Sequence, residues 1–110
     1  IIKTGGDDLD PREQIQKERQ RTMAHAELLK AVAHPVRLCL VHQLAQYGPR
    51  SVTFFTDCMD CSQSSISQHL AKLRAAGVVC ADRDGQQMVY RLTDERIREI
   101  LAVLWNEKGE

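Results

Sequence analysis

Apolar residues recur at helical spacing through most of the chain and predict a mainly α-helical protein with one short β-hairpin. The clearest stripe is Ile66, Leu70 and Leu73, at positions i, i+4 and i+7 of a helix expected over residues 62–76. Gly77 follows this stripe and supplies the left-handed residue that commonly ends a helix. The opposite face of the helix is polar, so one side packs on a core and the other side is available to a partner.

Two further helices are expected nearer the N-terminus, and a proline marks the start of each. Asp10 can cap a helix whose first residue is Pro11 and which runs to the break at Pro35. A second helix begins at Pro35 and ends at Gly48-Pro49. Both carry an apolar stripe on one side, which predicts two half-buried helices.

The middle and the end of the chain add a short segment of ambiguous type and a hairpin. Residues 51–60 suit a short helix capped by Ser51, and a strand is the competing interpretation. Residues 78–92 are expected to form two strands around Asp84-Gly85, which is a strong signal for a two-residue hairpin turn.

A last helix, capped by Thr93, is expected to follow the hairpin. The predicted order is therefore four helices, two strands and a final helix. A length of 110 residues is close to the size of one domain. Residues 10–110 are expected to form this domain, behind a mobile arm of residues 1–9 that combines a glycine pair with acidic residues.

Composition indicates an ordinary globular protein and narrows the functional classes. Apolar residues make up 43% and charged residues 27% of the chain, and no apolar run approaches the roughly 18 residues that span a bilayer. Without a visible secretory signal, we expect a cytoplasmic protein with reduced cysteines. The formal net charge is zero, so binding to nucleic acid has to depend on a local excess of basic residues.

The order of the elements itself predicts binding to double-stranded DNA. Two short helices joined by a polar connection and followed by a two-stranded wing form a scaffold that lays one helix in the DNA major groove. Short polar side chains can reach base edges, while basic residues and the helix N-terminus suit phosphates. The residues expected to contact DNA are Ser62, Gln63, Ser64, Ser65, Ser67, Gln68, His69, Lys72, Arg74, Arg83, Gln86 and Gln87. The alternative is a solvated helix face beside a hairpin that only packs.

Four segments of the chain resemble the ArsR/SmtB family of winged helix-turn-helix repressors. They are LKAVAHPVRLCLVHQL, SQSSISQHLAKLRAAGVV, DRDGQQMVYRLTDE and IREILAVL, and they follow the family's order and spacing over about residues 24–105. The resemblance implies a homodimer held by its first and last helices and without catalytic activity. It also implies a repressor that binds a palindromic operator and leaves it when a metal, metalloid or thiol-reactive signal binds.

The last helix carries more apolar surface than one small core needs, which agrees with a dimer. The residues expected at the dimer interface are Leu28, Ile97, Ile100, Leu101, Leu104 and Trp105. The alternative is that this stripe belongs wholly to the core of a single chain. A helical dimerisation module that does not bind DNA is a further possibility for the whole protein.

Two metal sites of the resembled family are not reproduced in this sequence. The positions that match the family's C-x-C pair are Ser51 and Thr53, which offer no thiolate. The positions that match its carboxylate–histidine site are Asp94, Arg96, Glu107 and Glu110. Two imidazoles are missing from the second set, so a zinc site there is not expected.

Cys58 and Cys61 remain as the candidate pair for sensing a metal or a thiol-reactive signal. Their C-x-x-C spacing allows two thiolates to share a soft metal or metalloid ion, but a closed zinc site needs two more ligands. Cys61 is the better candidate for a reactive thiolate because it precedes a helix start, whereas aspartates flank Cys58. Sensing and simple packing both stay open. The alternative function is a small C-x-x-C thiol-redox or metal-carrying protein.

The histidines are expected to be structural rather than metal-binding. His34 suits capping or packing, and His69 suits the role of a hydrogen-bond donor on a helix face.

Overall fold

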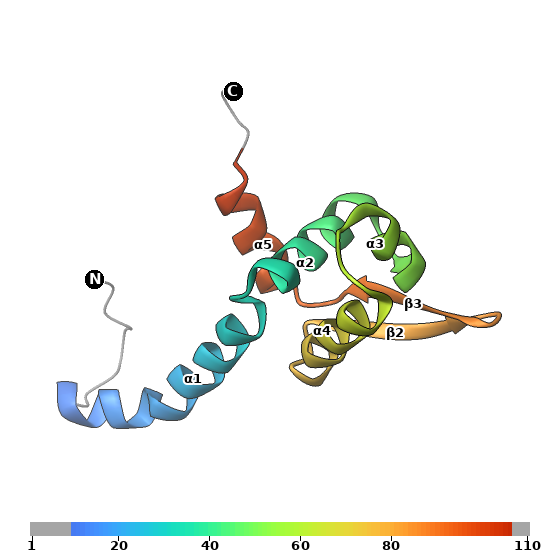
Figure 1. Cartoon of the computed structure of the whole chain (residues 1–110). Coiled ribbons are helices and arrows are strands. Elements are labelled where there is room, and N and C mark those ends of the chain that lie inside the picture. Colours follow the sequence, from blue (N-terminus) through green and yellow to red (C-terminus); the bar gives the residue numbers. More distant parts are fainter. Residues whose placement is uncertain (1–9, 107–110) are drawn as a thin grey trace.

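The computed structural model describes residues 10–106 (Figure 1). The predicted order of helices and hairpin is confirmed, with one two-residue strand added. The elements are α1 Pro11–Val32, α2 Pro35–Tyr47, β1 Arg50–Ser51, α3 Val52–Cys58, α4 Gln63–Ala75, β2 Val79–Asp84, β3 Gln87–Leu92 and α5 Glu95–Leu104. The expected mobile arm lies outside the described residues.

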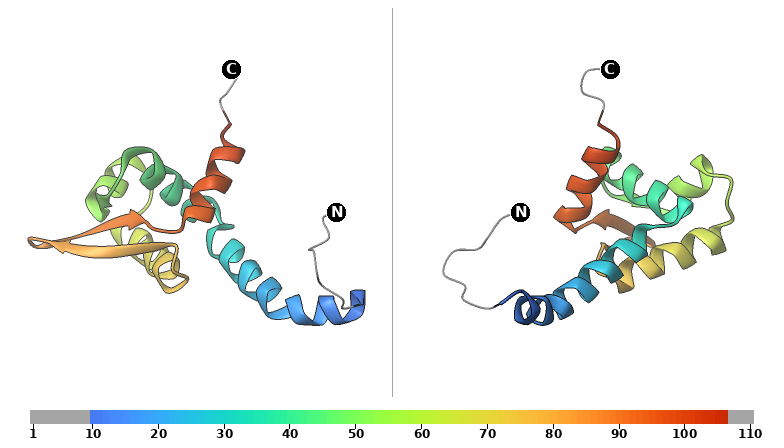
Figure 2. Two further views of the ribbon diagram at one scale, coloured as in Figure 1. Left: turned by 180° about the vertical axis from the view of Figure 1, so that it is seen from behind. Right: turned by 90° about the vertical axis from the view of Figure 1, so that its left-hand side faces the viewer.

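Helix α1 starts as its sequence predicts and then projects away from the other elements (Figures 1 and 2). The carboxylate of Asp10 accepts a hydrogen bond from the backbone N–H of Glu13 at 3.0 Å, and Pro11 is the first helical residue. Only Leu28 and Val32, both in the last turns of α1, are buried. Most of α1 is therefore exposed in the single chain.

The ambiguous segment forms a helix preceded by a very short strand. Arg50 and Ser51 pair with Tyr90 and Val89 of β3, and Val52–Cys58 is helical. The helical interpretation is therefore confirmed, although the Ser51 side chain makes no capping hydrogen bond. The three strands form an antiparallel sheet in the order β1-β3-β2.

The hairpin turn lies one residue later than the sequence predicts. Asp84 pairs with Gln87, so the two loop residues are Gly85 and Gln86. Gly85 has a φ of 67°, whereas no residue other than glycine has a positive φ in the described chain. A glycine with positive φ at the first loop position is typical of a II′ turn, which leaves Asp84 free to pair in the strand.

The cap of α5 also differs from the prediction, because Asp94 and not Thr93 occupies the N-cap. The Asp94 carboxylate accepts hydrogen bonds from the N–H groups of Arg96 (2.8 Å) and Ile97 (3.1 Å). The Thr93 hydroxyl instead donates to the carbonyl of Val78 at 3.1 Å. Hydrogen bonds from the Arg96 side chain hold the pKa of Asp94 below its ordinary value.

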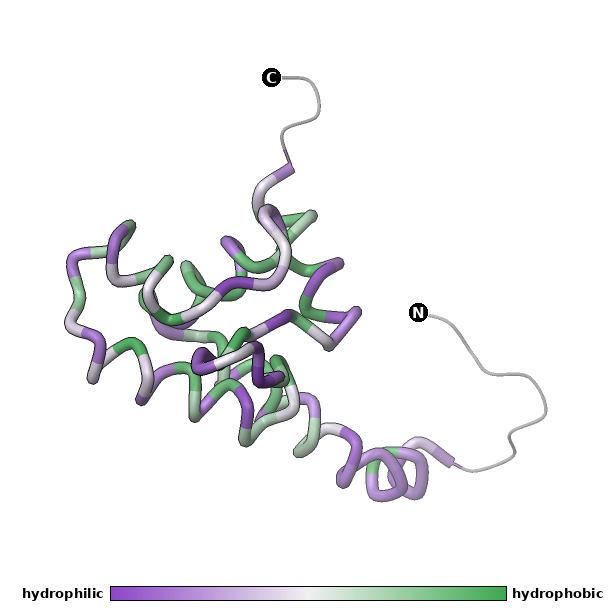
Figure 3. Tube along the Cα trace, turned by 90° about the vertical axis from the view of Figure 1, so that its right-hand side faces the viewer, coloured by the Kyte–Doolittle hydropathy of each residue, from purple (hydrophilic) through white to green (hydrophobic). Residues whose placement is uncertain are grey.

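The core forms where α2, α3, α4 and the sheet meet, with the ends of α1 and α5 packed against it. Its fully buried members are Leu40, Val41, Phe55, Ile66, Leu70, Leu73 and Val78. Figure 3 shows apolar segments gathered among these elements and a mostly hydrophilic start of α1. Within the described residues, no helix is both long and apolar enough to cross a membrane.

The cap of α5 gives a prediction about stability. Asp94→Ala removes the acceptor of two backbone amides, so we expect the free energy of unfolding to fall by about 1–2 kcal/mol at neutral pH. The difference from wild type should shrink below about pH 4, because protonation of a carboxylate with a lowered pKa removes the same stabilisation. Urea unfolding at both pH values measures this. Glu99→Ala, an exposed change in the same helix, should stay within about 0.5 kcal/mol of wild type. Equal losses in the two variants would contradict the capping role.

Candidate nucleic-acid interface

Helix α4 is fixed to the body by its inner stripe and by caps at both ends. Ile66, Leu70 and Leu73 are each 0% exposed. The Ser62 hydroxyl accepts a hydrogen bond from the N–H of Ser65 at 3.1 Å, which satisfies one free amide of the first turn. At the other end, Gly77 has a φ of 78° and lets the chain turn into β2. The helix is therefore a rigid support for its outer face.

The outer face of α4 is polar and open to solvent. Ser64, Gln68 and Lys72 are exposed, and their spacing of four residues places them in one row opposite the buried stripe. The remaining exposed members of the set expected to contact DNA are Ser62, Gln63, Arg74, Arg83, Gln86 and Gln87. The members that are partly buried are Ser65, Ser67 and His69.

The structure brings the start of α4 close to the tip of the hairpin. Gln63 and Ser67 of α4, with Gln86 and Gln87 of the hairpin, line a hollow of 380 Å³ that also reaches Ser51. The hairpin extends outward beside α4 (Figure 1). Polar side chains from two separate segments thus form one continuous surface.

His69 points away from this row and toward the corner between α1 and α2. The Arg37 guanidinium lies 3.2 Å from Nδ1 of His69 and donates a hydrogen bond of 2.7 Å to the carbonyl of Ala31. The His34 and His69 rings lie 4.6 Å apart. Burial, with the charges of His34, Arg37 and Lys72, holds the pKa of His69 below its ordinary value. Because a guanidinium only donates, Nδ1 of His69 accepts in this contact, and the donor role expected from the sequence is left to Nε2.

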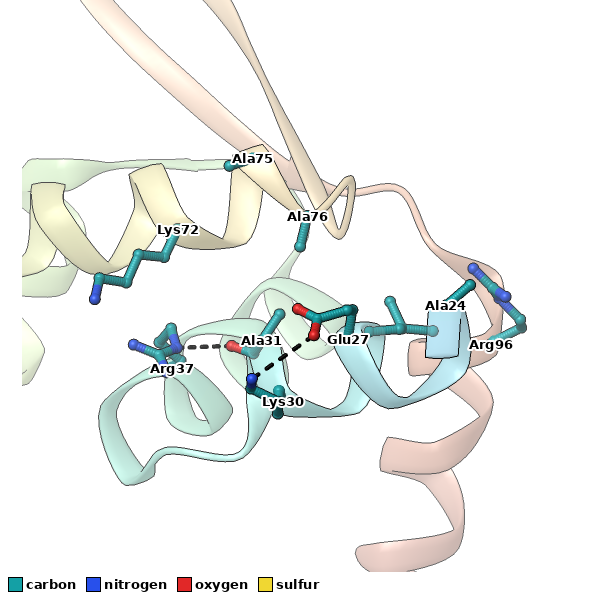
Figure 4. Close-up of a pocket in the computed structure, with 10 residues that line it drawn as sticks. Ala24, Glu27, Lys30, Ala31, Arg37, Lys72, Ala75, Ala76 and Arg96 are labelled. Atoms are coloured by element: carbon teal, nitrogen blue, oxygen red, sulfur yellow. Dashed lines mark hydrogen bonds and ion pairs between the residues drawn. The ribbon is translucent and has the colours of Figure 1, made fainter. Parts of the chain in front are cut away.

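A basic cleft lies beside α4, and reasoning from the sequence missed it. The cleft has a volume of 680 Å³ and separates α4 from α1 and from the start of α5 (Figure 4). Its charged lining residues are Glu27, Lys30, Arg37, Lys72 and Arg96. Lys30 pairs with Glu27 at 3.7 Å and Arg96 pairs with Asp94 at 2.7 Å, so the local positive charge of this edge comes from Arg37 and Lys72, although the formal net charge of the chain is zero. Arg37 lies in LKAVAHPVRLCLVHQL, one of the four segments that resemble the family, and that resemblance was the signal in the sequence that could have pointed to it.

The two candidate sensing cysteines lie on the connection from α3 to α4. Cys58 is exposed at the end of α3, and Cys61 is partly buried against the core just before Ser62. Both are free thiols. Among residues 10–106, no group of three or more histidine, cysteine or acidic side chains is placed to hold a metal ion. Cys58 and Cys61 are therefore the candidate ligands on this connection.

The apolar stripe expected at a dimer interface divides into two parts. Leu28, Ile97 and Leu101 lie in the core of the single chain, with at most 8% of their surface exposed. Ile100 packs partly against the same core. Leu104 and Trp105 are 60% and 36% exposed, and the ring of Trp105 stacks on His42 with centroids 3.8 Å apart. Surface for a partner is therefore available at the end of α5 rather than along its whole stripe.

Helix α4 with its buried apolar stripe, the preceding helix α3 and the two-stranded wing of β2 and β3 together define a winged helix-turn-helix protein. Residues 32–79 match the family model described as a helix-turn-helix domain. This match, together with the 37–42% identity to the relatives described next, shows that the chain belongs to the ArsR/SmtB family of winged helix-turn-helix transcriptional regulators, a family that is not enzymatic. This confirms the resemblance drawn from the sequence.

Three relatives carry this assignment. The chain is 42% identical over 87 residues to the HTH-type transcriptional repressor SmtB of Mycobacterium tuberculosis. This match covers 79% of the chain and 64% of that repressor, so the chain spans less than two thirds of its length. It is 37% identical over 81 residues to the HTH-type transcriptional regulator YgaV of Escherichia coli, covering 74% of the chain and 82% of that regulator. The crystal structure of the transcriptional repressor BigR from Xylella fastidiosa superposes with a TM-score of 0.72 at 32% identity, over 92% of this chain and all of that one.

Proposed function

We propose that the chain is a sequence-specific DNA-binding repressor that works as a homodimer on a palindromic operator in the cytoplasm. The observation that carries this proposal is the exposed row of Ser64, Gln68 and Lys72 on a helix whose opposite face is completely buried. A rigid helix with small polar residues at its start fits the DNA major groove. The relatives named above as repressors and regulators support the same role.

In this proposal, α4 is the reading helix and the surrounding surface holds the DNA backbone. Ser64 and Gln68 can exchange hydrogen bonds with base edges, since both side chains donate and accept. Lys72 lies one turn farther along, beside the basic cleft, where a phosphate is the natural partner. The exposed hairpin residues Arg83 and Gln86 would contact the adjacent backbone or groove.

A dimer is supported by apolar surface left exposed at the end of α5 and along α1. Val103 and Leu104 are 74% and 60% exposed, and Ile15 and Met23 on α1 are 69% and 62% exposed. A two-fold axis that pairs these surfaces would bury them and present two reading helices to two half-sites.

The cysteine pair is the proposed entry point of a chemical signal. Cys61 directly precedes Ser62, the cap of the reading helix, so a ligand or bond at this thiol would disturb the first turn of α4. A soft metal or metalloid ion could bind both thiolates. Alternatively, a peroxide could oxidise the two thiols to a disulfide, taking up two electrons and two protons as it is reduced to water. In either case the DNA-free arrangement would be favoured.

The reading helix gives the first prediction on DNA binding. Gln68→Ala should cost about 1–3 kcal/mol on the operator and relax the preference at one base pair. Lys72→Ala should weaken binding to all sequences and reduce the salt slope by about one. Titrations of the operator and of random DNA at several salt concentrations separate the two effects. If both variants lose equal affinity for random DNA, the assigned roles are wrong.

The exposed end of α5 gives a prediction on assembly. Leu104→Asp should produce monomers with weak operator binding, because it places a charge in the proposed interface while leaving the core of the single chain intact. Tyr47→Asp, a matched change at an exposed aromatic residue of α2, should remain dimeric. Sedimentation measures both proteins. A monomeric wild type would refute the dimer.

The cysteine pair gives a prediction on signalling. The agents to test are peroxide, a polysulfide, arsenite, cadmium and zinc. The agent that is the signal should weaken the operator affinity of wild type about 5- to 150-fold, which is the usual range of allosteric coupling. A Cys58→Ser, Cys61→Ser protein should not respond to that agent, whereas Cys80→Ser, a control at a partly buried thiol in β2, should respond as wild type does. Identical responses of wild type and the double variant to every agent would show that the pair only packs.

A further inference from the structure

We propose that His34 and His69 form a proton-sensitive joint that sets the position of α4, so that sequence-specific DNA binding weakens when these rings are protonated. The two rings lie 4.6 Å apart, one at the corner between α1 and α2 and the other on α4. The consequence for DNA rests on the proposed function. The joint itself is a property of the DNA-free protein.

The bond between Arg37 and His69 can exist only when His69 is neutral. A guanidinium has five N–H donors and no acceptor, so Nδ1 of His69, at 3.2 Å from Arg37, must offer its lone pair. The proton of the neutral ring then lies on Nε2. A second proton, on Nδ1, would set N–H against N–H and break the contact.

The hydrogen bond of His34 also requires an unprotonated Nδ1, although its donor is a backbone amide. Its Nδ1 accepts a hydrogen bond from the backbone N–H of Val36 at 3.1 Å, which makes His34 the N-cap of α2. A backbone amide cannot reverse its role, so protonation at Nδ1 removes the cap. If both rings were protonated, two positive charges would also face each other across 4.6 Å.

These bonds join three helices. Arg37 belongs to α2, donates through Nε to the Ala31 carbonyl at the end of α1, and contacts His69 of α4. His69 directly follows Gln68, which points outward toward the proposed groove. A change at His69 therefore reaches a base-contacting position without passing through the apolar core.

The charges that act on His69 all disfavour its protonated form. They belong to His34, Arg37 and Lys72, and they add to the effect of burial in lowering the pKa of His69. On α1, Glu27 lies in the same cleft but pairs with Lys30 at 3.7 Å. With a lowered pKa, the folded protein binds this proton more weakly than the unfolded chain does. Stability should therefore fall as the pH drops through about 6.5 toward the pKa of folded His69, and should not depend on this group at higher pH.

The test on DNA compares wild type with a protein in which neither ring can titrate. In His34→Asn, His69→Gln, the asparagine can still cap α2 and the glutamine carbonyl can still accept from Arg37. From pH 7.5 to pH 5.5, wild-type affinity for the operator should fall about 3- to 10-fold relative to random DNA, the change that loss of a single net hydrogen bond produces. The double variant should keep its affinity ratio, and His25→Gln, at an exposed histidine of α1, should behave as wild type does.

Two results on DNA would overturn the proposal. One is an unchanged pH dependence in the double variant. The other is tighter binding to both DNAs at pH 5.5 that disappears in the variant, because His69 would then contact a phosphate directly.

A measurement without DNA separates this proposal from the proposed function. In an NMR titration of the free protein, the His69 ring should take up its proton at higher pH in Arg37→Gln than in wild type, because the variant removes a positive charge and a donor that require a neutral ring. Coincident titration of His69 in wild type and in Arg37→Gln would overturn the joint. If wild type binds no DNA at pH 7.5, the proposed function fails, and this titration alone decides whether the joint exists.

Discussion

The DNA-facing side of this molecule depends on the burial of one row of side chains on α4. Ile66, Leu70 and Leu73 are completely enclosed by α2, α3 and the sheet. Burying each contributes roughly 1.5–3 kcal/mol, which is large beside the 5–15 kcal/mol that stabilises a typical domain. Rotation of α4 about its axis would expose this row. The outward direction of Ser64, Gln68 and Lys72 is therefore fixed by apolar packing, although none of the three contributes to it.

Local signals in the sequence predicted the elements well because each depends on neighbouring residues. The bounds of α1, α2 and α4 follow from Pro11, Pro35 and Gly77, whose backbone preferences need no distant partner. The prediction of the N-cap of α5 was wrong because two adjacent residues are suited to that position. Thr93 and Asp94 can both cap a helix, and the choice was made by the carbonyl of Val78, which engages the Thr93 hydroxyl from a distant turn.

The polar face of the candidate site could be predicted from the sequence, whereas the contacts that hold α4 against its neighbours could not. The short polar residues of α4 and the hairpin are visible as a pattern, whereas Arg37 and His69 are 32 positions apart and meet only in the folded chain. Periodicity carries no information about such a pair. The division of the α5 stripe has a similar cause, since Leu101 and Leu104 have the same helical spacing in the sequence but only Leu101 is buried against the core of the folded chain.

The two proposed signals, one at the cysteine pair and one at the histidine pair, reach α4 through polar contacts at its edges. Such contacts are weak enough to change without unfolding the protein. Removing a large side chain from the buried row typically costs 2–5 kcal/mol, enough to threaten folding itself. A hydrogen bond contributes only about 0.5–1.5 kcal/mol net, which is comparable to the free energy that changes a binding constant severalfold. The cap at Ser62, beside Cys61, and the contact between Arg37 and His69 are both of this smaller kind. A signal at either place can therefore alter the fit of α4 to DNA while the apolar row keeps the protein folded.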